Sequence, residues 1–359
     1  MVSFAIMKTH RLIIHPESPD LEQIKIAAQI IQQGSLVAFP TETVYGLGAN
    51  ALNYHAVKQI FTVKNRPLSD PLIVHIHSIN QISDVAIDIP DSATRLANLF
   101  WPGPLTLILQ KHPNMPDIVS AGQQTVAVRV PNHPVALALI SMAEVPIAAP
   151  SANMFSRPSP TTANHVFEDF DGKIQTIIDS GPTSIGIEST VVDLTQEPKI
   201  LRFGGIDPEL LLEKLPDIQF PPQKIPQINH QSNSPGMMLK HYSPKAQLIL
   251  FSGPSIRLVI EEIKHFLSNH NHQDKKISIM TCDEAIPLIT SWQIPFKSLG
   301  SLNQPKQIAN RLFSAMRAFD ESSVDIILAT DIPLDGLGIA IHDRLFRAAE
   351  GKMIVAMKR

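Results

Sequence analysis

The stretch SLVAFPTETVYGLGANA, residues 35–51, begins with an apolar run and continues into hydroxyl, carboxyl and glycine residues. The apolar part, 35–40, predicts a buried strand, and the polar part predicts a loop at the end of that strand. Glycines let backbone N–H groups approach a ligand, and Thr41, Thr43 and Tyr45 supply hydroxyls. The pattern favours a ligand loop at a strand end of an α/β sheet, although an ordinary strand–turn–helix connection has a similar composition.

Further strands and helices extend outward from this stretch. Asp20 and Gly34 fit the two caps of a helix over 21–34. Because strands and helices interleave without strict alternation, the pattern predicts a mixed sheet covered by helices. Other helices are predicted at 53–64, 91–100, 134–143 and 207–215, and strands at 71–76, 105–110, 125–130, 174–180, 189–194 and 199–204. Residues 146–153 are predicted to run from a strand into a loop.

The sequence changes character after residue 206. Residues 207–245 are rich in proline and, after one helix, indicate a linker. Strands and helices then alternate regularly, which is typical of a small parallel βαβ domain. We therefore predict a first domain at 15–206, a linker at 207–245 and a second domain at 246–359. In the second domain, strands are predicted at 247–251, 276–281 and 324–330, and helices at 255–268, 304–319 and 337–351.

Composition excludes several classes of protein. The 359 residues are 44% hydrophobic and 18% charged, as in globular proteins of two domains. No apolar run approaches the ~18–20 residues of a membrane helix, and no secretory leader is evident. The single cysteine, Cys282, excludes an internal disulfide framework, so we expect a cytoplasmic protein. A net charge of −3 argues against binding nucleic acid by bulk electrostatics.

Two short motifs carry groups that suit a phosphorylated ligand. Lys64-x-Arg66 stands before Pro67 at a predicted helix end, where two cations suit polyphosphate oxygens or complement the helix dipole. Ser151-Ala152-Asn153 ends a strand and is followed by SRPSPT, a cradle for phosphate or ribose that also fits a turn with a cap at Thr161 or Thr162.

Arg129 lies inside the apolar strand TVAVRVP and must find a partner, either a substrate carboxylate or a structural acid. Arg202 in KILRFG poses the same question, and His75 is unusual for lying inside a strand. The chain lacks the motifs H-E-x-x-H and G-x-S-x-G, which disfavours hydrolysis by a zinc-bound water or a serine triad. Cations, hydroxyls and glycines without a nucleophile favour nucleotide chemistry by positioning and charge neutralisation.

Taken together, these blocks resemble the YrdC-like threonylcarbamoyl-AMP synthases in their longer, two-domain form. The resemblance covers about residues 15–359 and rests on several blocks in family order. They are PTETVYGLGANA, KNRP with PLIVHI, WPGPLTLIL, TVAVRVP, PIAAPSAN with SRPSPT, SGPTSIGIESTVVD and ILRFGGI, together with SPGMMLKHYSP and GLGIAIHDRLFRAAEGK of the long form.

The resemblance implies a fold and a reaction. The fold is a YrdC-like mixed twisted sheet with flanking helices, followed by a small Rossmann-like parallel βαβ domain. The reaction is the ATP-dependent condensation of L-threonine with bicarbonate or carbon dioxide, which yields L-threonylcarbamoyladenylate and pyrophosphate. Mg²⁺ is expected to accompany the ATP. The product supplies a tRNA-modifying threonylcarbamoyl transferase complex.

The resemblance also implies residue roles. Lys64, Arg66, Ser151 and Asn153 correspond to the signature pairs, with the two cations on the phosphates and Asn153 on the nucleotide. Threonine is expected among Thr43, His75, Arg129, Ser151 and Ser189, with Arg129 on its carboxylate. Thr125, Thr161 and Arg202 are expected to complete the ATP site, and Tyr242 in the linker to close over the nucleotide as part of a lid. A linker that only tethers the domains is the alternative.

Two departures from the family pattern bear on nucleotide binding. Asp70 is also expected at the phosphates, where relatives carry an asparagine, and an acid there repels ATP unless it faces Mg²⁺. The lid segment reads Met237-Met238-Leu239-Lys240, where relatives often carry a lysine and a tyrosine.

Two other functions remain as alternatives. One is an RNA-binding module, with weak affinity for tRNA or double-stranded RNA on a concave basic face, and the near-neutral charge counts against it. The other is a carbamoyl transferase that uses carbamoyl phosphate and does not need threonine.

Overall fold

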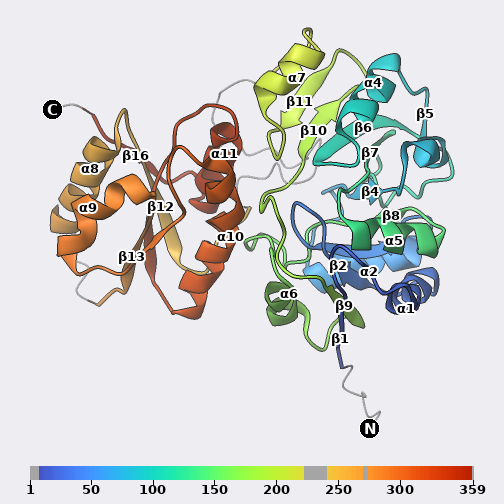
Figure 1. Ribbon diagram of the computed structural model, residues 1–359, viewed down its shortest axis with the longest axis horizontal. Helices are drawn as coiled ribbons and strands as arrows, with labels where there is room; N and C mark the ends of the chain where they lie inside the picture. Colours follow the sequence, from blue (N-terminus) through green and yellow to red (C-terminus); the bar gives the residue numbers. More distant parts are fainter. Residues whose placement is uncertain (1–7, 222–240, 270–273, 358–359) are drawn as a thin grey trace. The chain divides into compact units, whose positions relative to one another are not determined.

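The computed structural model of the chain describes residues 8–221, 241–269 and 274–357. These residues divide into two compact units (Figure 1). The first unit comprises 8–155 and 159–221, and the second comprises 156–158, 241–269 and 274–357. The short segment 156–158 of the N-terminal half is therefore part of the second unit.

The first unit is built on a mixed sheet, as the sequence predicts. Among the described residues it has eleven strands in the order β1-β9-β2-β3-β8-β4-β7-β6-β10-β11, with β5 paired to β6. Its neighbours are partly parallel, such as β4 with β7, and partly antiparallel, such as β6 with β7. The strands are β1 (His10–Ile13), β2 (Val37–Phe39), β3 (Gly46–Asn50), β4 (Ile73–His75), β5 (Ala86–Ile87), β6 (Leu105–Lys111), β7 (Thr125–Arg129), β8 (Ile147–Ala148), β9 (Thr176–Asp179), β10 (Thr190–Asp193) and β11 (Lys199–Arg202).

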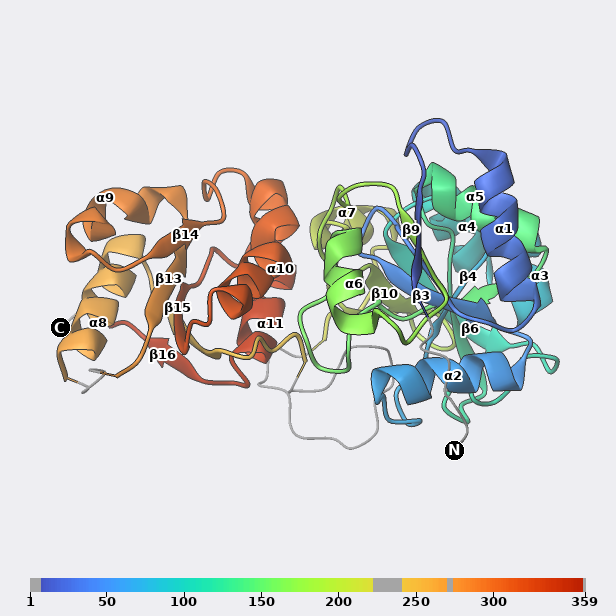
Figure 2. The ribbon, with the colours of Figure 1, turned by 90° about the horizontal axis from the view of Figure 1, so that it is seen from below.

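Helices pack on both faces of this sheet. Helices α1 and α5 lie side by side (Figure 2) and share a core with β2 and β9 that includes Ile24, Val37 and Ile178. The larger core, on the other side, joins α2, α4, α6 and α7 to alternate residues of β6 and β7. The helices are α1 (Leu21–Gln32), α2 (Tyr54–Lys64), η1 (Ile79–Gln81), α3 (Ile82–Val85), α4 (Asp91–Phe100), α5 (Pro134–Ala143), α6 (Ala163–Phe170) and α7 (Pro208–Lys214).

Strand β3 differs from the sequence prediction. The stretch after residue 40 was expected to be a loop throughout, but Gly46–Asn50 pairs antiparallel with β2 and continues the sheet. Gly48 explains why a glycine-bearing segment can do so. A Cβ at this position would lie 2.8 Å from the Phe39 ring and 2.9 Å from Ile147. The glycine thus lets two core side chains pack directly onto the β3 backbone.

The other residues of β7 face a second, smaller apolar cluster. Because side chains alternate along a strand, Val126 and Val128 enter the large core while Thr125, Ala127 and Arg129 point to the opposite face. Ala127 packs there with Ile73, Ile108 and Val191. This face carries Arg129 at one end of β7 and Thr125 at the other.

The second unit is a parallel α/β domain, as predicted. Its described strands follow the order β14-β13-β15-β12-β16, and each neighbouring pair is parallel. Helices α8 and α9 lie on one face of this sheet, and α10 and α11 on the other (Figure 1). The elements are β12 (Gln247–Ser252), α8 (Ile256–Asn269), β13 (Ile277–Thr281), η2 (Asp283–Ala285), α9 (Ile286–Ile289), η3 (Thr290–Trp292), β14 (Phe296–Ser298), α10 (Pro305–Glu321), β15 (Ile326–Thr330), α11 (Gly338–Ala348) and β16 (Met353–Val355).

The segment 156–158 is held within the second unit by polar contacts. The guanidinium of Arg317, on α10, donates two hydrogen bonds to the Pro158 carbonyl, at 3.1 and 2.8 Å. The Ser243 N–H donates to the Ser156 carbonyl at 2.7 Å. Arg317 is only 1% exposed, so the α10 helix and this segment form one packed structure.

The predicted linker, 207–245, begins with α7, whose Leu211 belongs to the core of the first unit. Residues 222–240, which include the altered lid segment Met237–Lys240, lie outside the described residues. None of the described helices has the length and apolarity needed to cross a membrane.

Candidate active site

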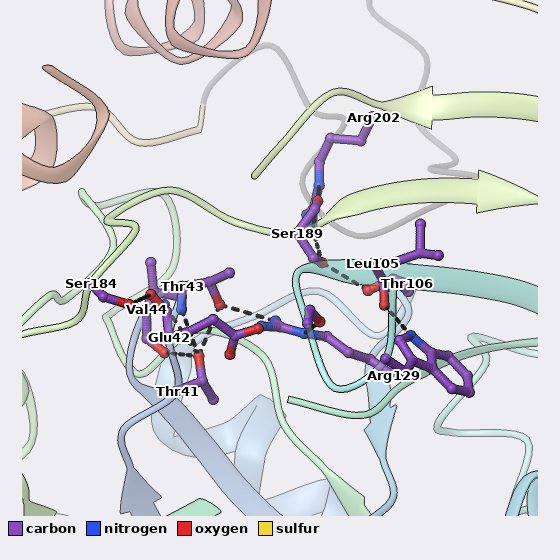
Figure 3. Close-up of polar contacts among 12 residues, drawn as sticks. Thr41, Glu42, Thr43, Val44, Leu105, Thr106, Arg129, Ser184, Ser189 and Arg202 are labelled. Atoms are coloured by element: carbon purple, nitrogen blue, oxygen red, sulfur yellow. Dashed lines mark hydrogen bonds and ion pairs between the residues drawn. The ribbon is translucent and has the colours of Figure 1, made fainter. Parts of the chain in front are cut away.

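A chain of hydroxyls shapes the loop between β2 and β3 (Figure 3). Arg129 Nη1 donates to Thr43 Oγ1 at 3.0 Å, and Thr43 Oγ1 lies 2.8 Å from Thr41 Oγ1. Thr41 Oγ1 in turn donates to the Val44 carbonyl at 2.7 Å. Since the Thr41 hydrogen is used on Val44, Thr43 is the donor between the two threonines. The loop is thus fixed before any ligand arrives.

Arg129 extends from the end of β7 into this loop and is 3% exposed. Its Nε donates to the Gly103 carbonyl at 3.1 Å, and its Nη2 lies 2.7 Å from Glu42 Oε1. Of the two partners that the sequence left open, the structural acid is thus present, and a substrate carboxylate on Arg129 stays a prediction. A buried arginine held on three sides is preorganised to bind a carboxylate.

His75 lies beside Arg129 because β4 and β7 are parallel neighbours and these two residues are register partners. Burial lowers the pKa of His75 to about 3, and the positive charge of Arg129 adds to the effect. The imidazole is therefore neutral at physiological pH. Its Nδ1 has no hydrogen-bond partner among the described residues, which leaves a neutral polar atom beside Arg129.

Ser189 and Arg202 form a second cluster in the same region (Figure 3). Ser189 Oγ lies 2.7 Å from Thr106 Oγ1, and Arg202 donates to both the carbonyl and the hydroxyl of Ser189. Gly204 permits this approach, because a Cβ there would lie 2.3 Å from the Ser189 carbonyl carbon. The RFGG segment is therefore packed tightly against the start of β10.

The two signature pairs meet through Lys64. This lysine is the last residue of α2 and is 1% exposed. Its Nζ donates to the Ser151 carbonyl at 2.6 Å and also to the Asn153 carbonyl. Asn65 follows in the left-handed conformation, with φ of 52°, and turns the chain toward Arg66. Lys64 thus connects the helix end to the 151–153 loop, which a purely dipolar role does not require.

Arg66 and Asp70 form a buried pair. Arg66 Nη2 lies 2.9 Å from Asp70 Oδ2, and the same guanidinium donates to the carbonyls of Asp70 and Pro71. Asp70 is fully buried. The acid that was expected to face the phosphates is thus paired with the neighbouring cation, which offsets part of its charge.

Backbone hydrogen bonds join the 183–186 segment to the β2–β3 loop. Ile185 N–H donates to the Glu42 carbonyl at 2.8 Å, and Gly186 N–H donates to the Thr43 carbonyl at 3.0 Å. Thr183 N–H donates to the carbonyl of Thr161, which is 3% exposed. Thr162, rather than Thr161, caps α6. Thr161 thus lies beside the loop that carries Thr43.

Thr125 is separated from these residues by the length of β7. It is four residues from Arg129 on the same face, or about 13 Å along the strand. It lines a pocket of about 430 Å³ with Ile108, Asp193, Lys199 and Leu201. A ligand that contacts both Thr125 and Arg129 must therefore extend along the sheet.

Tyr242 is part of the second unit and is fully buried there. Its ring lies 5.2 Å from the Phe313 ring and is covered by the guanidinium of Arg344 at 5.4 Å. Its backbone φ of 64° is in the left-handed region. A contact between Tyr242 and nucleotide remains a prediction.

Two further side chains contact these site residues, and the sequence alone predicted no role for them. Glu42 stands in the quoted loop motif and pairs with Arg129, and Thr106 contacts Ser189. For Glu42 the signal was an acid next to a buried strand, which needs a partner. For Thr106 no signal was available, because a threonine is an ordinary strand residue.

Comparison with known proteins bears on both units. A family model described as Telomere recombination matches residues 29–204, and one described as Threonylcarbamoyl-AMP synthase, C-terminal domain, matches residues 209–350. The threonylcarbamoyl-AMP synthase of Pyrococcus abyssi is 45% identical over 93% of this chain and 95% of its own length. That of Bacillus subtilis is 42% identical over 97% of this chain and 100% of its own.

A solved structure supports the same relation. The crystal structure of P. abyssi Sua5 complexed with L-threonine has a TM-score of 0.91 and 43% sequence identity to this chain. The match covers 97% of this chain and 100% of the P. abyssi chain. Since the likeness extends across both units at this identity, the chain belongs to the threonylcarbamoyl-AMP synthase family in its two-domain form.

Proposed function

We propose that this chain condenses L-threonine, bicarbonate or carbon dioxide, and ATP into L-threonylcarbamoyladenylate, with release of pyrophosphate. The observation that carries the proposal is the buried Arg129, held beside Thr43 in a chain 43% identical to a relative that binds L-threonine. A guanidinium in this setting suits the carboxylate of an amino acid.

Threonine is expected to bind around Arg129. Its carboxylate would accept hydrogen bonds from the guanidinium, near the hydroxyl of Thr43 and the neutral imidazole of His75. Ser151 and Ser189 complete the set of expected threonine contacts. Because these groups are buried or nearly so, they bind the ligand in a region of low dielectric, where each charge interaction is stronger than in water.

The chemistry needs no covalent enzyme intermediate. The threonine amine takes up the one-carbon unit and becomes a carbamate. A carbamate oxygen then attacks the ATP α-phosphorus, and the bond to pyrophosphate breaks in line. The chain's contribution is to hold the reactants in line and to neutralise charge, since the signature groups are cations, hydroxyls and amides.

ATP is expected to lie across the same face of the sheet. Lys64 and Arg66 would bind the phosphates, and Asn153, Thr161 and Arg202 the rest of the nucleotide. Thr125, about 13 Å from Arg129 along β7, is within the span of an extended nucleotide. In this placement the nucleotide extends along β7, between the two ends of the site.

Mg²⁺ is expected to enter with the phosphates. No three histidine, cysteine, aspartate or glutamate side chains are grouped for metal binding in the described ranges, and Asp70 is paired with Arg66. This donor set does not form a protein cage, and Mg²⁺ commonly keeps most of its ligands as water and phosphate oxygens.

We extend the proposal to the rest of the chain. Domains at 15–206 and 246–359, joined by a linker at 207–245 that closes as a lid with Tyr242, would exclude water from a labile carbamate and mixed anhydride. The product would pass to a tRNA-modifying threonylcarbamoyl transferase complex. The single cysteine and the use of ATP suit a reducing cytoplasm.

The direct test is pyrophosphate release from ATP, measured with and without L-threonine and bicarbonate. We expect release to require both co-substrates and to fall at least about tenfold in Lys64→Ala, because removal of a charged hydrogen-bonding group costs ~1.5–3 kcal/mol. Lys58→Ala is the matched control, since Lys58 lies on the same helix and is exposed.

Thermal unfolding of both variants separates a lost contact from a lost fold, because Lys64 is buried. Release without any dependence on threonine would contradict the proposal and favour carbamoyl transfer. Equal activity of Lys64→Ala and Lys58→Ala would contradict a role for Lys64 in the active site.

A further inference from the structure

Glu42 is a buried acid that the proposed reaction has not used. It is 4% exposed, and it lies in the loop that also carries Thr43. Neither carboxylate oxygen has a hydrogen-bond partner among the described residues, although Oε1 lies 2.7 Å from Arg129 Nη2. A buried carboxylate with vacant acceptor positions is costly and calls for an explanation.

A purely structural counter-ion would show a different geometry. Arginine and carboxylate groups that stabilise a fold form aligned, often bidentate, hydrogen bonds, and the remaining lone pairs are also satisfied. Here Arg129 Nε donates a hydrogen bond to the Gly103 carbonyl, and Nη1 donates to Thr43 Oγ1. Nη2 faces Glu42 without an aligned hydrogen bond. The pair is therefore close but incompletely bonded, with acceptor capacity left on Glu42.

An α-amino acid has the complementary arrangement of charges. Its carboxylate and ammonium stand on one carbon, so a cation and an anion at neighbouring positions can bind them together. Arg129 and Glu42 are such a pair, and both side chains are at most 5% exposed. The other titratable groups nearby are His75, beside Arg129, and His133, just before α5. Burial lowers the pKa of His133, and the charge of Glu42 opposes this effect.

We propose that Glu42 binds the ammonium group of L-threonine and accepts one of its protons, which generates the amine that attacks carbon dioxide. This proposal rests on the proposed function. An N–H bond of the ammonium breaks, the proton moves to a Glu42 oxygen, and the electron pair stays on nitrogen. That pair forms the N–C bond while one C=O π pair moves to oxygen. A second proton then leaves the nitrogen for water, which gives the carbamate, and Glu42 returns its own proton to water.

The proton transfer converts a carboxylate and an ammonium into two neutral groups. It also weakens the attraction between Glu42 and Arg129, so that Arg129 Nη2 is released toward the threonine carboxylate. Glu42 would thus be a catalytic residue for the first step, in direct contact with the substrate.

The test compares two ligands on two proteins by calorimetry, without ATP. The ligands are L-threonine and its analogue with a hydrogen atom in place of the ammonium, and the proteins are wild type and Glu42→Gln. We expect the variant to bind threonine about 10–100-fold more weakly, as for the loss of a charged hydrogen bond. Its affinity for the analogue should equal that of the wild type, because the analogue has no ammonium.

The alternative outcomes are separable. An equal loss for both ligands would mean that Glu42 only positions Arg129, and no loss for either would remove it from the site; each result overturns the proposal. If the wild type itself does not bind threonine, the proposed function fails instead. Glu209→Gln, an exposed acid on α7, is the control. If Glu42→Gln does not fold, Glu42→Asp replaces it, with threonine affinity retained in part and kcat reduced.

A pH profile tests the proton transfer itself. In Glu42→Gln, the deficit in threonine kcat/KM should shrink as the pH approaches the pKa of the free amine, because deprotonated threonine no longer needs a base. A deficit that stays constant with pH would contradict the role of Glu42 as a proton acceptor.

Discussion

At the scale of single residues, the site depends on charges held out of water. Arg129, Glu42 and Lys64 are each less than 5% exposed, and every one of them has a polar neighbour from another segment of the chain. The sequence shows that Arg129 needs a partner, because it lies in an apolar strand. It does not identify Glu42 as that partner, because 87 positions separate the two residues and only the fold brings the β2–β3 loop to the end of β7.

His75 gives a prediction at this scale. Its pKa is lowered from 6.5 to about 3 in the folded chain. Between these pH values the unfolded chain binds more protons, so the free energy of unfolding should decrease as the pH falls from about 6.5 toward 3. The slope approaches ~1.4 kcal/mol per pH unit for one such group. Urea unfolding of His75→Gln at pH 7, 6 and 5 should show a shallower acid dependence.

The exposed His10 provides the control for this measurement. His10→Gln should retain the acid dependence of the wild type. If His75→Gln and His10→Gln behaved alike, His75 would not be the group that loses a proton on folding.

At the scale of elements, β3 is a segment in which the sequence pattern predicts a loop and the structure has a strand. Its sequence GLGAN has two glycines and resembles a loop, and glycine disfavours strands in general. The segment is a strand because the Phe39 ring and Ile147 occupy the space that side chains would take at Gly48. Such a requirement depends on neighbours across the sheet, so no local pattern contains it.

We expect Gly48→Ala to destabilise the chain by ~1–3 kcal/mol, as for overpacking of a core. The added methyl would lie 2.8 Å from Phe39, which would have to move. Gly46→Ala, in the same strand, is the matched control, because its nearest contact would be 3.3 Å. Chemical unfolding of the two variants measures the difference. Equal stability of Gly48→Ala and wild type would show that the Phe39 ring can shift freely.

At the scale of the whole molecule, the division into units does not follow the chain. Segment 156–158 belongs to the second unit, although it comes only three residues after Asn153. Arg317 and Ser243 hold its carbonyls. The covalent chain therefore passes from the first unit into the second directly after the Ser151-Ala152-Asn153 motif.

We expect Arg317→Met to raise the KM for ATP several-fold and to lower stability by ~1–3 kcal/mol, because the Pro158 carbonyl loses both donors. Pyrophosphate release at varied ATP gives the KM, and thermal unfolding gives the stability. Arg311→Met is the control, since Arg311 lies on the same helix but is exposed. A loss of stability with an unchanged KM would show that the segment does not influence the nucleotide site.

The sequence by itself determined the class of each unit, most strand and helix positions, and the motif residues, since these follow from periodicity, caps and short local patterns. Only the tertiary structure decided which of those residues meet: Lys64 with the 151–153 loop, Arg66 with Asp70, and Arg129 with Glu42. It also decided that β3 is a strand and that 156–158 joins the second unit. The reason is physical. Buried polar groups find their hydrogen-bond partners, and close-packed glycines their packing neighbours, in segments distant along the chain, and a local pattern cannot specify those neighbours.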